Sequence, residues 1–447
     1  MNAQALPFPA PATEAADPLR AALARSSGVR HVGRVAEAYG TLIRVTGIHA
    51  SIGELCELRT PNASRRLLAE VVGLSGNKTL LTPLGPLEGL STATEVVAIG
   101  RKATVGAGDA LLGRILDPLG EPIDGRPLED LEEQVPIHRE SPNPLGRSLI
   151  ARPFATGVRA IDAALTVGEG QRVGIFAVAG GGKSTLLGML ARGSDAEVNV
   201  IVLVGERGRE VNEFIHDNLG GDGLARSVLV VATSDRPASE RARAAYLGTA
   251  IAEHFRDRGK RVLLMMDSAT RFARALRDVG LAVGEPPARR GYPPSVFSEL
   301  PRLFERSGNN ERGSITAFYT VLMEEEDGSD PVAEEVRSIL DGHIVLSRKL
   351  ASAYHYPAID VLASASRVMS RVASPDHVLA AGQLRKYIAK HQEIELLLQL
   401  GEYKPGADAD ADFAVARIEA MRQLLRQPPT ALSSFDEARD GLRRLFG

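Results

Sequence analysis

The chain has 447 residues, a length typical of about three domains, and its 44% hydrophobic and 24% charged residues are those of an ordinary globular protein. Its formal net charge of −3 argues against a large basic surface for nucleic acid. The single cysteine, Cys56, excludes an intramolecular disulfide and a cysteine-rich metal site, and it fits a reducing compartment.

The N-terminal region lacks the pattern of an export signal, because no charged segment is followed by an apolar one. No uninterrupted apolar run reaches the roughly 18 residues of a membrane-spanning helix. We therefore expect a cytoplasmic protein. Residues 1–27 begin with a stretch rich in alanine and proline and are predicted to form a flexible tail.

Residues 28–100 are predicted to form a β-barrel domain. Short β-branched and aliphatic runs follow one another here, separated by glycine, proline and asparagine. The runs are VGRVAEAYGTLIRV, GELCELR, RLLAEVVGL, KTLLTPLG and TEVVAIG. Small barrels bind single-stranded nucleic acid through stacked aromatic side chains, and Tyr39 is the sole Phe, Tyr or Trp in this range. We expect a structural or assembly role for the barrel and no nucleic-acid partner.

Residues 101–370 are predicted to form an α/β domain. Near-continuous apolar runs alternate here with helical patterns such as SERARAAYLGTAIAEHFRDRG. The apolar runs are GQRVGIFAVAG, EVNVIVLVG, SVLVVAT and KRVLLMMD. Unbroken apolar strands are typical of a parallel sheet that helices cover on both faces.

Residues 371–447 are predicted to form a helical domain. Ser374 suits an N-cap, Pro375 the first helical position, and Gly401 the end of that helix. Two more helices are expected around 410–427 and 434–446. One face of the first of these would carry Phe413, Ala416, Ala420 and Leu424.

The stretch AVAGGGKST, residues 177–185, lies between a buried strand and a helical pattern. A glycine loop at this place directs backbone N–H groups and the helix N-terminus toward one point, as phosphate binding requires. Lys183 would reach the β- and γ-phosphates of a nucleotide, and Ser184 would hold Mg²⁺. The alternative is a glycine-rich turn with a solvated lysine. The nucleotide-binding residues expected here are Ala179, Gly180, Gly181, Gly182, Lys183, Ser184 and Thr185.

Two acidic residues follow other apolar strands. Asp267 ends the run KRVLLMMD, and Glu206 comes just after NVIVLVG. Ligands of parallel sheets bind outside the carboxyl ends of the strands, so both acids should face Lys183. Nucleotide hydrolysis needs a carboxylate beside the attacking water and another for Mg²⁺. The alternative is that both acids are ordinary capping or loop residues.

Longer segments extend this interpretation. The glycine loop is accompanied by the segments GERGREVNEFI, MMDSATRFARALRDVG, GEPPARRGYPPSVFSELPRLFERSG, RSILDGHIVLSRKLA and YHYPAIDVLASASR. Together they resemble the ATPase of type III protein secretion, a sister of the flagellar export ATPase and of the catalytic subunit of rotary ATP synthases. The resemblance runs from about residue 30 to the C-terminus. It implies a β-barrel, a RecA-like P-loop nucleotide domain with a parallel sheet and a C-terminal helical domain, assembled as a homohexamer.

The resemblance also implies roles for the site residues. Glu206 would polarise the attacking water, with Arg207 and Glu210 beside it as phosphate-side and metal-water contacts. Asp267 would be the acid that holds Mg²⁺, and Arg271 would lie near the γ-phosphate. The metal set is then Ser184, Asp267 and Glu210, with ATP and Mg²⁺ as cofactors.

Two further roles come from the motifs HYPAID and SASR. Tyr356 matches an aromatic residue that stacks on adenine, and Arg367 an arginine that reaches into the neighbouring subunit's site. Without the resemblance, Tyr356 is equally well a core aromatic and Arg367 a surface ion pair. The catalytic set implied is Glu206, Lys183, Arg207 and Arg367.

Three positions carry expectations of their own. Val178 stands where the family usually has glycine, so it must be extended, and the glycines at 180–182 must supply any positive φ. His343 and His355 are each expected to be satisfied core residues.

The function implied is ATP hydrolysis that energises type III export by unfolding substrates or releasing them from chaperones. The partners implied are the stalk, stator and export-gate proteins of the secretion system and effector–chaperone complexes, with peripheral association at the inner membrane. The helical domain is a candidate receiver of substrate. Flagellar export ATPase is the nearest alternative. A rotary ATP synthase catalytic subunit, a non-catalytic nucleotide-binding subunit and an RNA translocase fit the residues less well.

Overall fold

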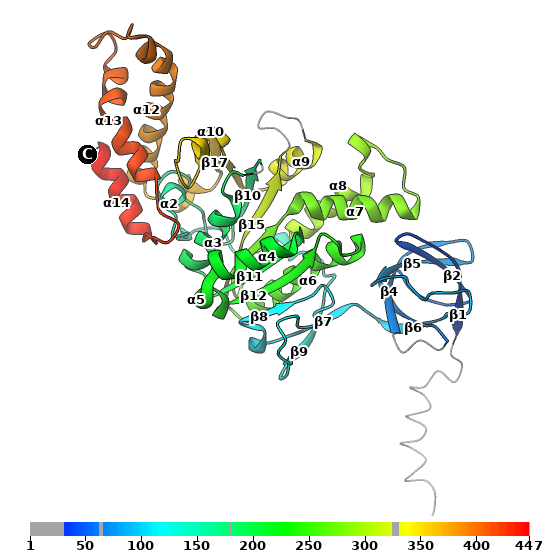
Figure 1. Ribbon diagram of the computed structural model, residues 1–447. Coiled ribbons are helices and arrows are strands. Elements are labelled where there is room, and N and C mark those ends of the chain that lie inside the picture. Colours follow the sequence, from blue (N-terminus) through cyan, green and yellow to red (C-terminus); the bar gives the residue numbers. More distant parts are fainter. Residues whose placement is uncertain (1–30, 62–65, 179, 324–329, 447) are drawn as a thin grey trace, which may run out of the picture. The chain divides into compact units, whose positions relative to one another are not determined.

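The structure is a computed structural model that describes residues 31–61, 66–178, 180–323 and 330–446 (Figure 1). The chain divides into two compact units. The first comprises Met1–Tyr39, Ile43–Pro83 and Leu87–Arg101, and the second comprises Gly40–Leu42, Leu84–Pro86 and Lys102–Gly447. The expected tail lies outside the described residues, and the domain limits expected from the sequence stay predictions.

The first unit is a closed β-barrel, drawn in blue in Figure 1. In barrel order its strands are β1 (Val32–Tyr39), β2 (Leu42–Thr46), β5 (Lys78–Leu84), β4 (Arg66–Ser75), β3 (Glu54–Arg59) and β6 (Glu95–Lys102), and β6 pairs with β1. Alternate side chains such as Val35, Ile43 and Leu58 fill the interior, where Cys56 is a buried free thiol. The expectation of a β-barrel is confirmed.

The second unit is built on a mainly parallel sheet. In spatial order its strands are β17 (Ile359–Ser366), β16 (Gly342–Leu346), β10 (Arg172–Ala177), β15 (Ser314–Leu322), β13 (Arg261–Asp267), β11 (Val198–Glu206), β12 (Ser227–Thr233) and β8 (Arg114–Leu116). Neighbours from β16 to β8 run parallel, whereas β17 is antiparallel to β16 and β14 (Gly308–Asn309) is antiparallel to β15. Every residue of β11 is buried, which explains its unbroken apolar sequence.

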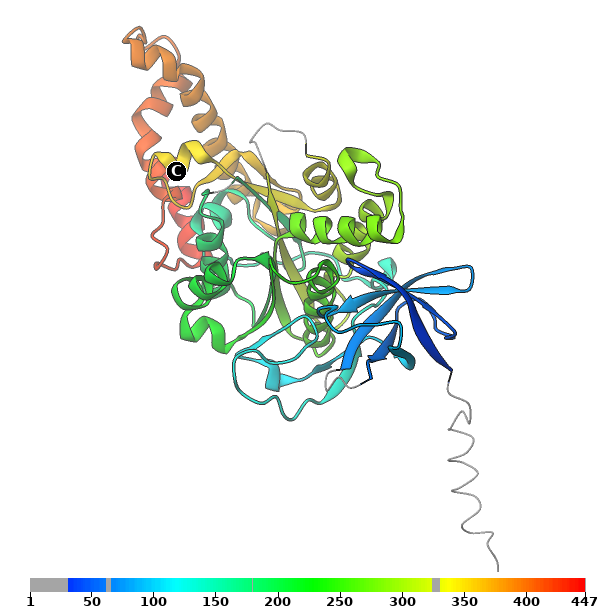
Figure 2. The same ribbon diagram turned by 45° about the vertical axis from the view of Figure 1, so that its right-hand side comes forward.

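Helices cover both faces of this sheet (Figures 1 and 2). Leu203 of β11 shares a core cluster with Leu186 of α3 (Lys183–Gly193). Val202 points to the opposite face, against Gly248 of α6 (Ala238–Asp257). A Cβ on Gly248 would stand 2.2 Å from Cγ2 of Val202, so only glycine permits this close approach. The α/β sheet expected from the sequence is confirmed.

Shorter elements connect these layers. The remaining helices are η1 (Asp109–Leu111), η2 (Pro144–Gly146), α2 (Arg159–Ala164), α4 (Gly208–Glu213), the π-helical η3 (Phe214–Leu219), α5 (Gly220–Ala225), α7 (Ala269–Val283), η4 (Arg289–Gly291), α8 (Pro294–Phe304), α9 (Pro331–Ile339), α10 (Arg348–Ser352) and α11 (Met369–Val372). A small antiparallel ribbon joins β7 (Thr104–Ala107) to β9 (Glu133–Pro136). No helix in the described ranges is long and apolar enough to span a lipid bilayer.

The C-terminal helices are α12 (Pro375–Leu400), α13 (Ala409–Leu425) and α14 (Phe435–Phe446). Figure 2 shows α12 and α13, in orange, extending together from the sheet-containing core. The Ser374 side chain accepts a hydrogen bond from the His377 N–H, and Gly401 ends α12 in the left-handed conformation at φ 70°. The start and end signals of α12 are therefore confirmed.

The expected apolar face of α13 is wrong in part. Ala416 is exposed, and Phe413, Ala420 and Leu424 are half-buried. The buried positions are instead Ala411, Ala414, Met421 and Leu425. The physical reason is that α13 packs against both α12 and α14, so its contact surface is not one stripe of helical period.

A buried ion pair gives a stability test of the second unit. Arg306 donates to both carboxylate oxygens of Glu253 on α6, at 3.0 and 2.7 Å, and to the backbone oxygen of Ile137. Both side chains are almost fully buried, at 2% and 1% exposure. We expect Glu253→Gln to destabilise the protein by about 3–5 kcal/mol, because it leaves a buried guanidinium without its counter-charge.

Thermal and denaturant unfolding would measure this effect. The matched control is Glu334→Gln, which removes the exposed pair with Arg289 and should change the midpoint little. Equal shifts for the two variants would contradict the structural role of the buried pair.

Candidate active site

The glycine loop joins the carboxyl end of β10 to the N-terminus of α3. Gly180 and Gly182 have φ of 83° and 81°, the left-handed conformation that glycine adopts without strain. Val178 is buried and is not among the residues with positive φ, as its side chain requires. Ala179 lies outside the described residues. The loop therefore has the conformation expected at those three positions.

Lys183 begins α3 and meets both expected acids. Its Nζ lies 2.5 Å from Oδ1 of Asp267 and 3.4 Å from Oε1 of Glu206. Asp267 and Glu206 are the last residues of the adjacent strands β13 and β11. Both acids are buried, with 4% and 6% exposure. The structure thus brings together the lysine and the two carboxylates that the sequence singled out.

Two neighbours fix the orientation of these carboxylates. Thr320 of β15 donates its hydroxyl to Oδ1 of Asp267 at 2.8 Å. Arg271, in the first turn of α7, lies 2.7 Å from Oε1 of Glu206 and donates to the backbone oxygen of Gly205. Thr320 carries no signal in the sequence, because the hydroxyl is recognisable only once β15 lies between β10 and β13.

Charge and burial set the protonation of Glu206. Burial, and next the negative charge of Asp267, raise the pKa of Glu206 above its ordinary value. The cationic Lys183 and Arg271 act in the opposite direction. A carboxylate with a raised pKa is a better acceptor for a hydrogen bond from water than an ordinary glutamate.

The expected flanking residues lie toward solvent. Arg207 and Glu210 form an exposed ion pair of 3.0 Å at the start of α4. A hydrogen bond with Glu206, and next the Arg207 guanidinium, lower the pKa of Glu210. Ser184 is exposed and Thr185 half-buried in the first turn of α3.

Tyr356 lies beside the glycine loop. A Cβ built on Gly182 would stand 3.6 Å from Cε1 of its ring. The residue is 38% exposed, so part of the ring is accessible. Tyr356 therefore belongs to the same region as Lys183, on the side of the loop away from the acids' strands β13 and β11.

Gln427 is a residue that the sequence did not single out. Its backbone N–H donates to the oxygen of Tyr356 at 2.8 Å. Its side chain donates to the oxygens of Gly157 and Ala431 and accepts from the N–H of Arg159. This buried residue thus joins the helical region to Tyr356 through its backbone, and to Gly157, 270 positions earlier in the sequence, through its side chain.

Arg367 is not brought to this cluster. Ser366 pairs with Gly342 at the start of β16, whereas Ile359 pairs with Leu346 at its end. Since β16 is parallel to β10, Arg367 lies at the amino edge of the sheet, opposite the glycine loop. Its side chain is exposed and donates to the oxygen of Arg337, and within the described residues it forms no ion pair.

Family models match three segments of the chain. Residues 35–100 match the β-barrel domain of the ATP synthase alpha/beta family, and residues 157–366 match its nucleotide-binding domain. Residues 373–444 match the T3SS EscN ATPase C-terminal domain. The nucleotide-binding match covers the glycine loop, both buried acids and Tyr356.

Whole-length relatives agree with these matches. A type 3 secretion system ATPase of Xanthomonas euvesicatoria is 60% identical over 407 residues, 91% of this chain and 92% of that protein. The assembled ATPase EscN from the type III secretion system of enteropathogenic E. coli has a TM-score of 0.88 at 46% identity, covering 93% of this chain and 100% of that one. EscN in complex with its central stalk EscO gives a TM-score of 0.86 over the same shares. The chain therefore belongs to the family of type 3 secretion system ATPases.

Proposed function

We propose that the chain hydrolyses ATP with Mg²⁺ at the carboxyl edge of its sheet, and that this hydrolysis drives type III protein export. One observation supports the proposal. Nζ of Lys183 lies within 3.4 Å of carboxylate oxygens of both Asp267 and Glu206, and Lys183 directly follows a loop with two left-handed glycines. A phosphate chain and an attacking water are the ligands that such a set suits.

The phosphates would lie against the N–H groups of the glycine loop and draw Lys183 toward them. Asp267 would then lose its ion pair with the lysine. Bound Mg²⁺ supplies positive charge between phosphate and carboxylate oxygens, and the exposed hydroxyl of Ser184 and the Asp267 carboxylate would hold it. The described residues form no cluster of three or more His, Cys, Asp or Glu that could cage a metal. A site that relies on substrate phosphates does not need one.

Glu206 would orient and polarise the attacking water. Its carboxylate is buried beside Asp267 and is held by Arg271, so it cannot turn freely into solvent. Glu210, whose pKa is lowered, would stay ionised and contact a metal-bound water. Arg207 and Arg271 would contact the phosphate side as charge develops there.

The residue that contacts adenine and the arginine that contacts the transition state would come from different copies of the chain. Tyr356 offers a partly exposed ring next to the loop, suited to stacking on a base. Arg367 lies at the opposite edge of the sheet, so it can serve only the site of a neighbouring copy. A homohexameric ring with shared sites follows, and an unpaired, exposed guanidinium is what such sharing requires.

The partners of the ring are proposed from its relatives. EscN has been solved with its central stalk EscO, and we propose a stalk protein for this ring too. Stator and export-gate proteins, effector–chaperone complexes and peripheral attachment to the inner membrane complete the proposal. Substrate unfolding or release from chaperones would use the helical region, which stands apart from the ATP site.

The first test removes the water-polarising acid. We expect Glu206→Gln to retain ATP binding and to lower kcat by about 10²–10⁴-fold, because the amide cannot accept a proton or orient water as the carboxylate does. Binding of a fluorescent ATP analogue and phosphate release would measure the two quantities. Glu213→Gln, at an exposed position of the following helix α4, is the control. Loss of binding equal to the loss of turnover would assign Glu206 a structural role instead.

The second test concerns the shared site. We expect Arg367→Ala to lower turnover by about 10³–10⁵-fold in assembled rings, the range seen for arginines supplied by a second protein. Arg371→Ala, an exposed arginine nearby, should have little effect. Mixing the Arg367→Ala and Glu206→Gln proteins should restore activity, since mixed interfaces combine an intact acid with an intact arginine. Mixed rings without activity would contradict sharing.

The third test concerns the positioning of Tyr356. We expect Gln427→Met to raise KM for ATP roughly fivefold. The backbone hydrogen bond to Tyr356 stays, but the side-chain bonds to Gly157, Ala431 and Arg159 that position it are lost, at a cost of about 1 kcal/mol. Hydrolysis of tripolyphosphate, which has no base, should keep its KM. Gln423→Met, exposed on α13, is the control. An equal change with both substrates would show a general disturbance of the site.

A further inference from the structure

A second pocket, of about 250 Å³, lies in the unit that contains the sheet. Its walls are α10, the start of β17, the middle of α12 and the last turns of α13, elements that Figure 1 shows together. Neither the glycine loop nor Glu206 nor Asp267 lines it. It is therefore a site separate from the one proposed for ATP.

One part of the pocket wall is aliphatic. The apolar lining residues are Leu350, Ala353, Ile359, Val361, Ile388, Ile418 and Leu425. At about 30 Å³ for each water-sized group, the pocket holds roughly eight such groups. The wall thus suits a short apolar chain or a single ring.

Positive charge dominates one side of the pocket. Arg422, in the last turn of α13, and Arg426, the residue that follows this helix, both line it. The Arg422 side chain forms no ion pair with any described residue, and Nε of Arg426 is buried without a hydrogen-bond partner. Arg426 otherwise contacts Glu419 at 3.3 Å.

The two acidic side chains that line the pocket already have hydrogen-bond partners. Asp360 accepts hydrogen bonds from the N–H groups of Leu362 and Ala363. Glu395 accepts from Lys349 at 3.3 Å. Among the charged lining side chains, Arg422 is the one for which the described residues supply neither an ion pair nor a hydrogen bond, so an anionic group complements it.

A buried imidazole completes the polar side. His355 lines the pocket with 4% of its surface exposed, and its Nε2 has no hydrogen-bond partner. The sequence expectation of a satisfied core histidine is therefore wrong for His355, whereas His343 does contact the oxygen of Ala363. Burial, followed by Arg426 and Arg422, lowers the pKa of His355 to about 4. Its ring is neutral at neutral pH and keeps one nitrogen available to a ligand, because an unpaired buried polar atom is unfavourable.

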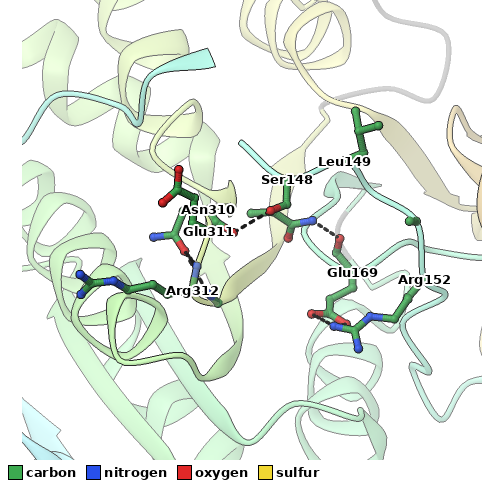
Figure 3. A pocket seen from close by; sticks show the side chains of 10 residues that line it. Ser148, Leu149, Arg152, Glu169, Asn310, Glu311 and Arg312 are labelled. Carbon is green, nitrogen blue, oxygen red and sulfur yellow. Dashed lines mark hydrogen bonds and ion pairs between the residues drawn. The ribbon is translucent and has the colours of Figure 1, made fainter. Parts of the chain in front are cut away.

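We propose that this pocket binds a small molecule of about eight to ten heavy atoms in all, in which an apolar body carries one carboxylate or similar anionic group. The anion lies toward Arg422 and His355, and the apolar body lies against Ile388, Ile418 and Leu425. Another pocket of the second unit, of about 290 Å³, has equal numbers of basic and acidic lining residues, Arg152 and Arg312 against Glu169 and Glu311, and Arg152 pairs with Glu169 across it (Figure 3).

A ligand in this pocket would affect Tyr356, the proposed adenine contact, through the backbone. His355 precedes Tyr356, Arg426 precedes Gln427, and the Gln427 N–H donates to the Tyr356 oxygen. A ligand held by His355 and Arg426 therefore stabilises the hydrogen-bonded pair that follows them. The binding itself is independent of the proposed ATPase mechanism, and only this coupling depends on Tyr356 contacting adenine.

Octanoate, with eight carbons and one carboxylate, is the probe. Calorimetry on the full chain should show one site per subunit, with octanoate binding at least about tenfold tighter than octan-1-ol, and no binding of octylammonium. Arg422→Gln should weaken octanoate binding about tenfold, and Ile418→Trp, which fills the pocket, should abolish it. Arg417→Gln, an exposed arginine outside the pocket on the same helix, should leave binding unchanged.

The proposal would be overturned if octanoate and octan-1-ol bind with equal affinity. It would also be overturned if Arg422→Gln and Ile418→Trp both bind octanoate as tightly as the unsubstituted chain does. Thermal unfolding and oligomer size of each variant separate loss of the site from loss of the fold. Adding ADP should tighten octanoate binding severalfold, because coupling between two sites is reciprocal. If ADP leaves the octanoate affinity unchanged, the coupling is contradicted but the pocket is not. The KM for ATP of Tyr356→Ala then tests the adenine contact separately, because an unchanged KM would contradict that contact.

Discussion

Lys183 lies between two buried carboxylates, and the charge balance at that point governs what the site can hold. Asp267 and Glu206 are too buried to be compensated by solvent, so each needs a cation. Lys183 and Arg271 provide that charge within the chain. A ligand that engages the lysine must therefore bring positive charge of its own, which is the chemistry of a metal-bound triphosphate and not of a free anion.

The sheet explains why these groups meet. Its central strands are buried on both faces, so polar side chains are excluded along their length and accumulate at their carboxyl ends. The parallel direction of β10, β15, β13 and β11 then gathers the glycine loop, Thr320 and both acids at one edge. The antiparallel β17 sends Arg367 to the other edge. One topological reversal thus separates the residues that a single copy combines from Arg367, which we propose it offers to a neighbour.

The junction with the C-terminal helices combines a shared apolar core with polar contacts directed at the backbone. Gln427 links Gly157, Arg159, Ala431 and the Tyr356 oxygen, and the pocket proposed for an apolar anion lies directly behind this junction. Each of these hydrogen bonds contributes only about 1 kcal/mol, so they orient the helices on the core more than they stabilise the contact. The proposed base contact and the proposed second ligand therefore act on the same junction between the nucleotide core and the helices.

The sequence by itself determined the barrel, the buried strands, the caps of α12 and the loop glycines, because periodicity and φ requirements are local properties. It also identified Lys183, Glu206 and Asp267, since strand ends are visible in the sequence. Tertiary structure alone decided the contacts of Gln427, the buried face of α13 and the unsatisfied nitrogen of His355. Each of these depends on which other segment packs against the residue, and no local pattern in the sequence encodes that partner.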